Sequence, residues 1–132
     1  MEADAVILGV GTDLIEIERV RRSVERFGDR FLERVFTPFE IAYCRRKVHG
    51  AAESFAARFA AKEAGAKALG TGISRGVRWT EIEVRNERGG KPGIVWSGRA
   101  LERAEAMGVV GTQLSLTHSR ELAMAVVIVE GA

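Results

Sequence analysis

The sequence has one cysteine, few aromatic residues and no long apolar run, and each scarcity excludes a class of protein. A single cysteine, Cys44, cannot form a disulfide within the chain, and no other Cys or His stands near it at metal-ligand spacing. No apolar stretch approaches the length of a membrane span, and the acidic start of the chain is unlike the positive start of a signal peptide. We therefore expect a cytoplasmic protein without a membrane partner.

The charge of the chain is nearly balanced, with 20 Lys and Arg against 18 Asp and Glu and a net charge of +2. Together with an aromatic content of 7%, this balance disfavours nucleic acid as a partner. Any basic surface has to come from local clustering of arginine and lysine. The 132 residues, 46% of them hydrophobic, match the size and composition of one globular domain, so we expect a single domain over residues 1–132.

A short strand followed by helices is predicted for the first part of the chain. Residues 6–10 form an apolar run that ends among glycines, which indicates a strand and a turn and places Asp13 near the exit of the strand. Apolar residues at helical spacing then predict a helix from Ile17 that ends at Gly28, with a short continuation over residues 31–36.

Two further helices are predicted from capping and composition. Thr37, Pro38 and Glu40 form a capping box with proline at the first helical position, and this helix runs to about Lys47. The alanine-rich segment 51–69 favours helix throughout and is closed by glycine. It is the strongest helix prediction in the chain.

The rest of the chain is typical of strands with one more helix. Alternating apolar residues and turn signals predict a serine-capped helix at 101–107 and strands at 79–85, 94–96, 114–117 and 122–129. The last two strands form an antiparallel hairpin with a polar tip. We therefore expect an α+β fold, in which the long alanine-rich helix packs on a mainly antiparallel sheet.

The glycine-rich segments match no standard phosphate-binding motif. Gly9 and Gly11 lack the third glycine of a dinucleotide-binding turn, and Gly70-Thr71-Gly72 lacks the Gly-Lys-Ser or Gly-Lys-Thr of a P-loop. A simple helix stop is an equally good interpretation of the second segment.

Two acidic residues are the metal candidates. Taken alone, Asp13 fits an acidic helix cap, and Glu63 fits an exposed ion pair with Lys67 four residues later. However, Phe55 and Phe59 precede Glu63 and Lys67 at the same four-residue interval, and a helix face that carries phenylalanine is usually covered. Carboxylates at a covered margin need a cation, and oxygen ligands without His or Cys suit magnesium, which in turn suggests phosphates near Lys67.

His118 stands at the end of a predicted strand, on the same side as Leu114 and Leu116. It fits a packed core histidine as well as a base or a phosphate contact.

A row of arginines lies on one side of the first predicted helix. Arg19, Arg22 and Arg26 cluster at about 100° per residue, and Phe27 flanks them. A solvated basic face is the simpler interpretation, and a surface that docks an acidic helix is the functional one. Arg30 would extend the row if the helix continued that far.

Taken together, these blocks resemble the holo-acyl-carrier-protein synthases, the small bacterial 4'-phosphopantetheinyl transferases. The resemblance rests on Gly9-Val10-Gly11-Thr12-Asp13 with Ile17 and Arg19, on Phe55-Ala-Ala-Arg-Phe-Ala-Ala-Lys-Glu63-Ala with Lys67 and Gly70-Thr71-Gly72, on Gly90-Lys91-Pro92 and on Leu114-Ser-Leu-Thr-His118. The blocks stand in family order and spacing and span nearly the whole chain.

The resemblance implies that Asp13 and Glu63 hold a magnesium ion that bridges the pyrophosphate of coenzyme A, with Lys67 beside the transferred phosphate. The residues implied around the nucleotide portion are Arg58, Gly70, Thr71, Gly72, Lys91, Pro92 and His118. Family members are usually homotrimers with active sites between subunits, and their reaction supports fatty acid biosynthesis. Their acyl carrier protein is acidic, which gives the arginine row a partner.

The implied reaction is an in-line attack by a carrier-protein serine on the phosphorus attached to pantetheine, which expels adenosine 3',5'-bisphosphate. Glu63, directly or through a metal-bound water, or such a water alone, is the base, and Lys67 stabilises charge on the phosphoryl oxygens. Larger monomeric relatives place another acid where this chain has Ile15, so water is expected at that coordination position.

Two alternatives stay open at this point. One is a magnesium-dependent hydrolase of nucleotide pyrophosphates that uses the same two carboxylates with water as the nucleophile. The other is a non-enzymatic oligomeric module that binds an acidic partner through the arginine row, in which Asp13 and Glu63 have only structural roles.

Overall fold

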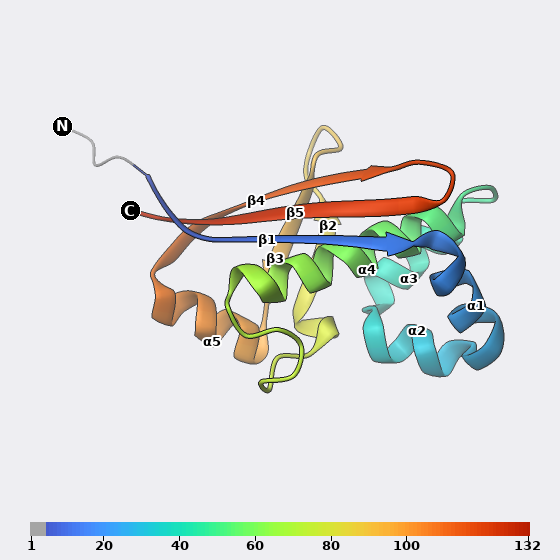
Figure 1. Ribbon diagram of the computed structural model, residues 1–132, viewed down its shortest axis with the longest axis horizontal. Helices are drawn as coiled ribbons and strands as arrows, with labels where there is room; N and C mark the ends of the chain where they lie inside the picture. Colours follow the sequence, from blue (N-terminus) through green and yellow to red (C-terminus); the bar gives the residue numbers. More distant parts are fainter. Residues whose placement is uncertain (1–4) are drawn as a thin grey trace.

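The computed structural model describes residues 5–132, and the first four residues of the expected domain lie outside it (Figure 1). Its elements are, in order, β1 (Val6–Glu16), α1 (Ile17–Phe27), α2 (Asp29–Val35), α3 (Pro38–Arg45), α4 (Ala51–Ala68), η1 (Trp79–Glu81), β2 (Ile82–Asn86), β3 (Pro92–Trp96), α5 (Gly98–Met107), β4 (Val109–His118) and β5 (Leu122–Gly131). Within the described chain, no helix has the length and apolarity that crossing a membrane requires.

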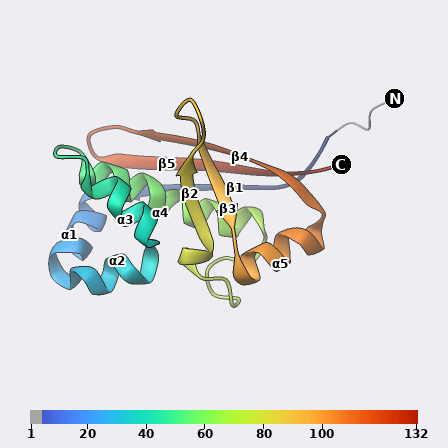
Figure 2. The same ribbon diagram turned by 180° about the vertical axis from the view of Figure 1, so that it is seen from behind.

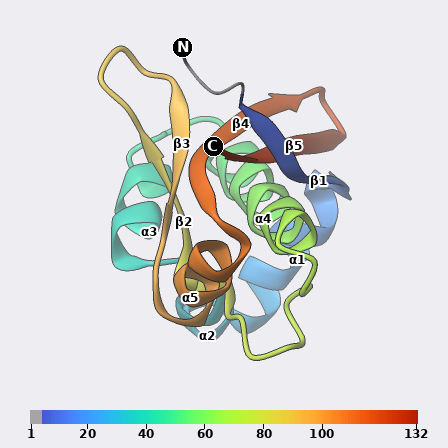
Figure 3. The ribbon, with the colours of Figure 1, turned by 90° about the vertical axis from the view of Figure 1, so that its left-hand side faces the viewer.

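The helix α4 lies between two antiparallel sheets. The long strands pair in the order β1-β5-β4 and cover one side of α4, while β2 and β3 form a separate hairpin that crosses α4 on another side (Figures 2 and 3). Helices α1, α2 and α3 gather at one end of α4, and α5 lies at the other end (Figure 1). This arrangement confirms the expected α+β fold.

Gly9 and Gly11 let β1 touch the backbone of α4. A Cβ atom at Gly11 would lie 1.8 Å from the Ala64 carbonyl oxygen, and one at Gly9 would lie 2.1 Å from that of Ala68. Any larger side chain would hold the strand away from the helix. The turn predicted after residue 10 is therefore wrong: β1 continues to Glu16, and the two glycines provide space rather than a change of direction.

Small side chains line α4 for the same reason. Ala60, Ala61 and Ala64 are completely buried beneath the three-stranded sheet. On the side of the β2–β3 hairpin, a Cβ atom at Gly65 would lie 3.1 Å from the Ile82 side chain. A helix that is covered on most sides needs apolar or small residues around its circumference. The alanine-rich composition therefore marks the central helix of the fold.

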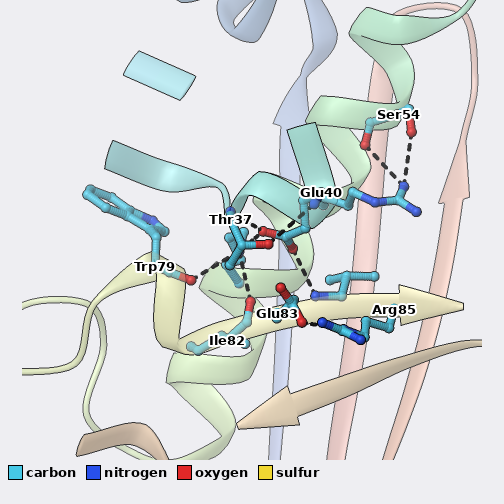
Figure 4. Close-up of polar contacts among 10 residues, drawn as sticks. Thr37, Glu40, Ser54, Trp79, Ile82, Glu83 and Arg85 are labelled. Carbon is cyan, nitrogen blue, oxygen red and sulfur yellow. Dashed lines mark hydrogen bonds and ion pairs between the residues drawn. The ribbon is translucent and has the colours of Figure 1, made fainter. Parts of the chain in front are cut away.

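A buried carboxylate joins α3 to α4 and β2. The predicted capping box is present, because the Thr37 amide donates to Glu40 Oε1 and the Glu40 amide donates to Thr37 Oγ1. The same carboxylate accepts from Lys62 Nζ at 2.6 Å and from the Val84 amide at 2.8 Å (Figure 4). The sequence pattern revealed the cap but not this second role.

Lys62 completes the network from the opposite side. Its Nζ donates to the backbone carbonyl oxygens of Trp79 at 3.0 Å and Ile82 at 2.8 Å, so it holds the two ends of η1. Lys62 and Glu40 are both fully buried. Burial lowers the pKa of Lys62, and the Glu40 carboxylate opposes that change. Removing one partner of such a pair costs about 3–5 kcal/mol, because the other charge is left unpaired.

Several element boundaries differ from the predicted ones. Ser97 stands at the N-cap of α5 without a side-chain hydrogen bond, and Glu81 Oε2 accepts from the Arg99 amide instead. Trp79 begins the 3-10 turn η1, so β2 starts later than predicted. The strand β4 starts at Val109 instead of residue 114, because its backbone already pairs there with the end of β5.

The face of the three-stranded sheet that points away from α4 carries a group of apolar side chains that no other part of residues 5–132 covers. Val10 and Leu14 of β1 expose 54% and 61% of their surface there. We call this surface the open face; its apolar residues are Val10, Leu14, Leu122, Met124, Val126 and Ile128. Contiguous exposed apolar surfaces mark sites of association.

Replacing Gly11 by alanine should destabilise the fold. The added Cβ atom would meet the Ala64 carbonyl oxygen at 1.8 Å, so β1 must shift away from α4. Overpacking of this kind costs about 1–3 kcal/mol of unfolding free energy. Gly111→Ala is the matched control, since its Cβ atom would meet only the flexible Glu130 carboxylate, at 3.6 Å. Urea unfolding measures both variants, and equal stabilities would contradict the close approach.

Candidate active site

Asp13 lies on the side of β1 that faces α4. It belongs to the row of alternate residues that contains Gly9 and Gly11. The close approach of β1 therefore brings its carboxylate to Lys67 of α4, with 3.3 Å between Oδ1 and Nζ. Asp13 does not cap a helix, because the N-cap residue of α1 is Glu16.

Lys67 binds the strand rather than Glu63. Its Nζ contacts Asp13 and also donates to the Thr12 carbonyl oxygen at 2.9 Å. The Glu63–Lys67 ion pair that the spacing allows is not found within residues 5–132. The row of four-residue steps along α4 instead runs from buried Phe55 to exposed Lys67.

Glu63 is half-buried on α4 and is held by an indole. Trp79 Nε1 donates to its Oε1 at 3.0 Å. Glu63, Asp13 and Arg19 line one pocket of about 340 Å³, which we call the carboxylate pocket. Its other lining residues are Leu14, Ile15, Val20, Ser23, Phe31 and Phe59.

The donor set of the carboxylate pocket fits a magnesium ion. Asp13 and Glu63 supply carboxylate oxygens, and neither His nor Cys lines the pocket. Magnesium binds oxygen and keeps several waters beside one or two carboxylates. No group of three or more His, Cys, Asp and Glu gathers anywhere in the described part of the chain, so water and ligand oxygens have to complete the coordination. Ile15 lines the pocket with a hydrocarbon side chain.

A second and larger pocket, of about 710 Å³, lies where the ends of α3 and β4 meet the start of α4. We call it the cationic pocket after its basic lining residues, which are Lys47, His49, Arg58, His118 and Arg120. Tyr43, Gly50, Glu53, Ser54, Ala57, Asn86, Pro92, Leu116 and Ser119 complete the lining. This distribution of charge suits an anionic ligand.

Arg58 is the buried cation of this pocket, with 5% of its surface exposed. Its Nη1 donates to Ser54 Oγ at 3.0 Å, its Nη2 donates to Asn86 Oδ1 at 3.4 Å, and its guanidinium lies 4.2 Å from the centre of the Tyr43 ring. Among the described residues, Nε has no hydrogen-bond partner and no carboxylate pairs with the guanidinium. A buried cation with neutral partners favours an anionic ligand.

Of the other residues that the resemblance implies for nucleotide binding, two line the cationic pocket and Lys91 does not. Pro92 and His118 line the cationic pocket. His118 lies on the side that strand parity predicts, but it is exposed beyond the edge of the core, so it is not a packed core histidine. Lys91 lies in the turn between β2 and β3 and donates to Gln113 Oε1 at 3.1 Å, outside both pockets.

The loop Gly70-Thr71-Gly72 ends α4. The Gly70 amide donates to the Lys67 carbonyl oxygen, and the amides of the next two residues donate to that of Ala66. Gly70 and Gly72 have φ angles of 76° and 61°, which glycine adopts without strain. The three amides therefore serve as a helix stop in this structure, and a nucleotide contact of the loop stays a prediction.

The functional candidates that the sequence did not reveal are three basic loop residues and Trp79 of η1. Lys47 and His49 precede α4, and Arg120 stands at the β4–β5 tip, so only tertiary packing joins them in the cationic pocket. Trp79 was also missed, because its partner Glu63 lies 16 residues earlier and no local pattern links the two. For Lys47, His49 and Arg120, the available sequence signal was a basic residue in a predicted loop with a histidine in it or beside it.

The arginine row lies on α1 beside the carboxylate pocket. Arg19 lines that pocket, and the side chain of Arg22 is 75% exposed. The guanidinium of Arg26 lies 5.1 Å from the centre of the Phe27 ring, which is 48% exposed. Arg30 does not extend the row, because the helix ends at Phe27 and Arg30 belongs to α2.

The two pockets lie on different sides of α4 and share no lining residue. Successive residues turn by about 100° around an α-helix, so Arg58 of the cationic pocket and Glu63 of the carboxylate pocket stand about 140° apart. A single chain therefore does not gather all the predicted site residues around one ligand.

Comparisons with known proteins agree with the resemblance. The sequence matches the family model of the 4'-phosphopantetheinyl transferase superfamily over residues 9–127. The holo-[acyl-carrier-protein] synthase of Solibacter usitatus is 53% identical over 125 residues, which cover 95% of this chain and 99% of that protein.

Solved structures show the same fold. The holo-[acyl-carrier-protein] synthase of Neisseria meningitidis has a TM-score of 0.84 and 34% identity, covering 94% of this chain and 98% of that chain. The Helicobacter pylori synthase in complex with coenzyme A has a TM-score of 0.80 and 33% identity, covering 91% of this chain and 98% of that chain. The chain therefore belongs to the 4'-phosphopantetheinyl transferase superfamily, in the family of holo-[acyl-carrier-protein] synthases.

Proposed function

We propose that the chain transfers the 4'-phosphopantetheine moiety of coenzyme A to a serine hydroxyl of apo acyl carrier protein and releases adenosine 3',5'-bisphosphate. The observation that carries this proposal is the carboxylate pocket, where the packing of β1 on α4 joins Asp13, Glu63 and, at its edge, Lys67. We place the reaction in the cytoplasm, where it supplies carrier protein for fatty acid biosynthesis.

Asp13 and Glu63 are the proposed ligands of a magnesium ion. When bound, this ion would neutralise the pyrophosphate oxygens and stabilise charge on the leaving group. Lys67 already lies within hydrogen-bond distance of Asp13, so its ammonium stands at the same place as the metal ligands and is available to the transferred phosphoryl oxygens.

Glu63 accepts the proton of the carrier serine in the proposed step, directly or through a water that it binds. The serine oxygen forms a bond to the phosphorus attached to pantetheine, while the bond from that phosphorus to the bridging oxygen breaks. The electron pair of the broken bond stays on adenosine 3',5'-bisphosphate. Lys67 balances the charge that develops on the transferred group.

The cationic pocket is the proposed site of the nucleotide end of coenzyme A. The free Nε and the neutral hydrogen-bond partners of Arg58 support an anion there, and His118 adds an exposed imidazole. Pro92 and the aromatic ring of Tyr43 offer apolar surface for the base. Lys91 and the Gly70-Thr71-Gly72 loop stay proposed contacts outside this pocket.

A homotrimer with sites between subunits is the proposed assembly. The two pockets lie on different sides of α4, so one coenzyme A would reach the cationic pocket of one copy and the carboxylate pocket of its neighbour. The open face of the sheet supplies apolar surface for self-association.

The arginine row is the proposed docking surface for the carrier protein. Arg22 and Arg26 are exposed, and Arg19 leads from them into the carboxylate pocket. An acidic carrier that binds this surface would therefore place its serine near Glu63. Attraction between opposite exposed charges weakens as salt screens them.

Transfer is tested by the intact mass of apo acyl carrier protein after incubation with the enzyme, coenzyme A and magnesium. The carrier should gain phosphopantetheine, and Glu63→Gln should lower the rate by about 10²–10⁴-fold, because the base is lost. Glu102→Gln on the exposed side of α5 should keep full activity. An unmodified carrier would refute transfer, free phosphopantetheine would indicate a hydrolase, and a fully active Glu63→Gln would remove Glu63 from the mechanism.

Sites between subunits are tested by mixing two inactive variants. Glu63→Gln disables one pocket and Arg58→Gln disables the other, so co-expressed chains should form some intact sites. Random assembly of equal amounts gives about one quarter of the wild-type activity, because each site needs one intact residue from each neighbour. Native mass spectrometry confirms that mixed oligomers form. Mixed oligomers without recovered activity would contradict the divided site.

Docking is tested by single charge reversals. Arg22→Glu should raise the KM for the carrier by roughly tenfold, about 1.4 kcal/mol, with kcat less affected. Arg99→Glu is the matched control, because Arg99 is also exposed and lies on α5 at the other end of α4. The KM should also rise with salt in the wild type. Equal KM values for the two variants would refute the docking surface.

A further inference from the structure

We infer that Trp79 is a positioning residue for Glu63, whose indole N–H fixes one carboxylate oxygen and leaves the other for the metal ion. The inference rests on the proposed metal site. Trp79 Nε1 lies 3.0 Å from Glu63 Oε1, and no other hydrogen bond of the Glu63 carboxylate is found within residues 5–132. Oε2 accepts no hydrogen bond from the described residues, so it is the oxygen left for a cation.

The indole is itself fixed by its neighbours. Its ring lies 6.2 Å from the Phe59 ring, which stacks on Phe31 at 6.5 Å, and the Arg34 guanidinium lies 5.8 Å from the indole centre. The backbone of Trp79 is held as well, because its carbonyl oxygen accepts from Lys62 Nζ. A donor with support on its ring and on its backbone cannot follow a moving carboxylate.

Glu63 needs such a partner because its side chain is long and half-exposed. Glutamate is among the side chains that lose most rotamer freedom when they are ordered. The indole hydrogen bond orders the carboxylate before the ion arrives. Outer partners of metal ligands act in this way elsewhere, and their removal typically weakens metal affinity or activity by about 10- to 100-fold.

The indole is neutral, so it holds the Glu63 carboxylate without reducing the negative charge of the site. The Asp13 carboxylate already shares its charge with Lys67. Trp79 donates a hydrogen bond to Glu63 without adding a positive charge, so Glu63 keeps its full attraction for a cation. A lysine or arginine at the same place would hold the carboxylate but compete with the ion.

The second tryptophan of the chain provides a matched control. Trp96 is partly buried like Trp79, but its Nε1 donates to Thr112 Oγ1 at 2.9 Å instead of to Glu63. Trp79→Phe and Trp96→Phe each remove one indole hydrogen bond and keep an aromatic ring. The two variants should therefore lose similar unfolding free energy but differ at the metal site.

The experiment measures magnesium dependence by activity and by binding. In Trp79→Phe, the half-saturating magnesium concentration should rise by about 10- to 100-fold in the transfer assay and in calorimetry with coenzyme A present. In Trp96→Phe, it should change by less than about twofold. Trp79 is the only tryptophan of that control chain, so its fluorescence should change as magnesium binds.

The outcomes separate this inference from the proposed function. Equal magnesium affinity in the two variants, or a Trp79 fluorescence that magnesium leaves unchanged, would overturn the positioning role. Absence of magnesium binding in the wild type, or full activity of Glu63→Gln, would overturn the metal site and the inference with it. A large rise of the half-saturating magnesium concentration in Trp79→Phe, without such a rise in Trp96→Phe, supports the positioning role and the metal site.

Discussion

The contact between the backbones of β1 and α4 is the constraint on which the rest of the structure depends. Gly9 and Gly11 have no side chain, so the strand packs directly on the helix carbonyl oxygens. That distance sets how far Asp13, on the same side of β1, lies from α4. The pairing of Asp13 with Lys67, across 54 residues of sequence, is a consequence. The contact between β1 and α4 therefore determines both the packing of the core and the position of Asp13 beside Lys67.

Two lysines of α4 differ in burial, and therefore in what their ammonium groups can contact. Lys62 is fully buried, paired with Glu40, and holds the carbonyl oxygens at both ends of η1. Lys67 is exposed and meets the carboxylate of Asp13 at the edge of a pocket. Only the exposed cation is free to meet a ligand. The buried one acts indirectly, because η1 carries Trp79 to Glu63.

Part of the site was not predicted from the sequence because its residues lie in loops. Asp13, Glu63 and Lys67 stand inside regular elements with recognisable sequence blocks, and the structure gathers them at the carboxylate pocket. Lys47 and His49 stand in a loop without periodicity, and tertiary packing alone brings them to Arg58.

Membership in a transferase family also decides against the non-enzymatic module, which residue patterns alone left open.

The sequence by itself determined most helices and strands, the α+β class and the family, because periodicity, caps and ordered blocks are local properties. It did not determine the purpose of the glycines in β1 or the second role of Glu40, since both depend on contacts with distant residues. Only the tertiary structure showed that Arg58 and Glu63, on the same helix, open into two different pockets. The helical rotation between two positions is fixed by sequence, but which surface each side meets is fixed by packing.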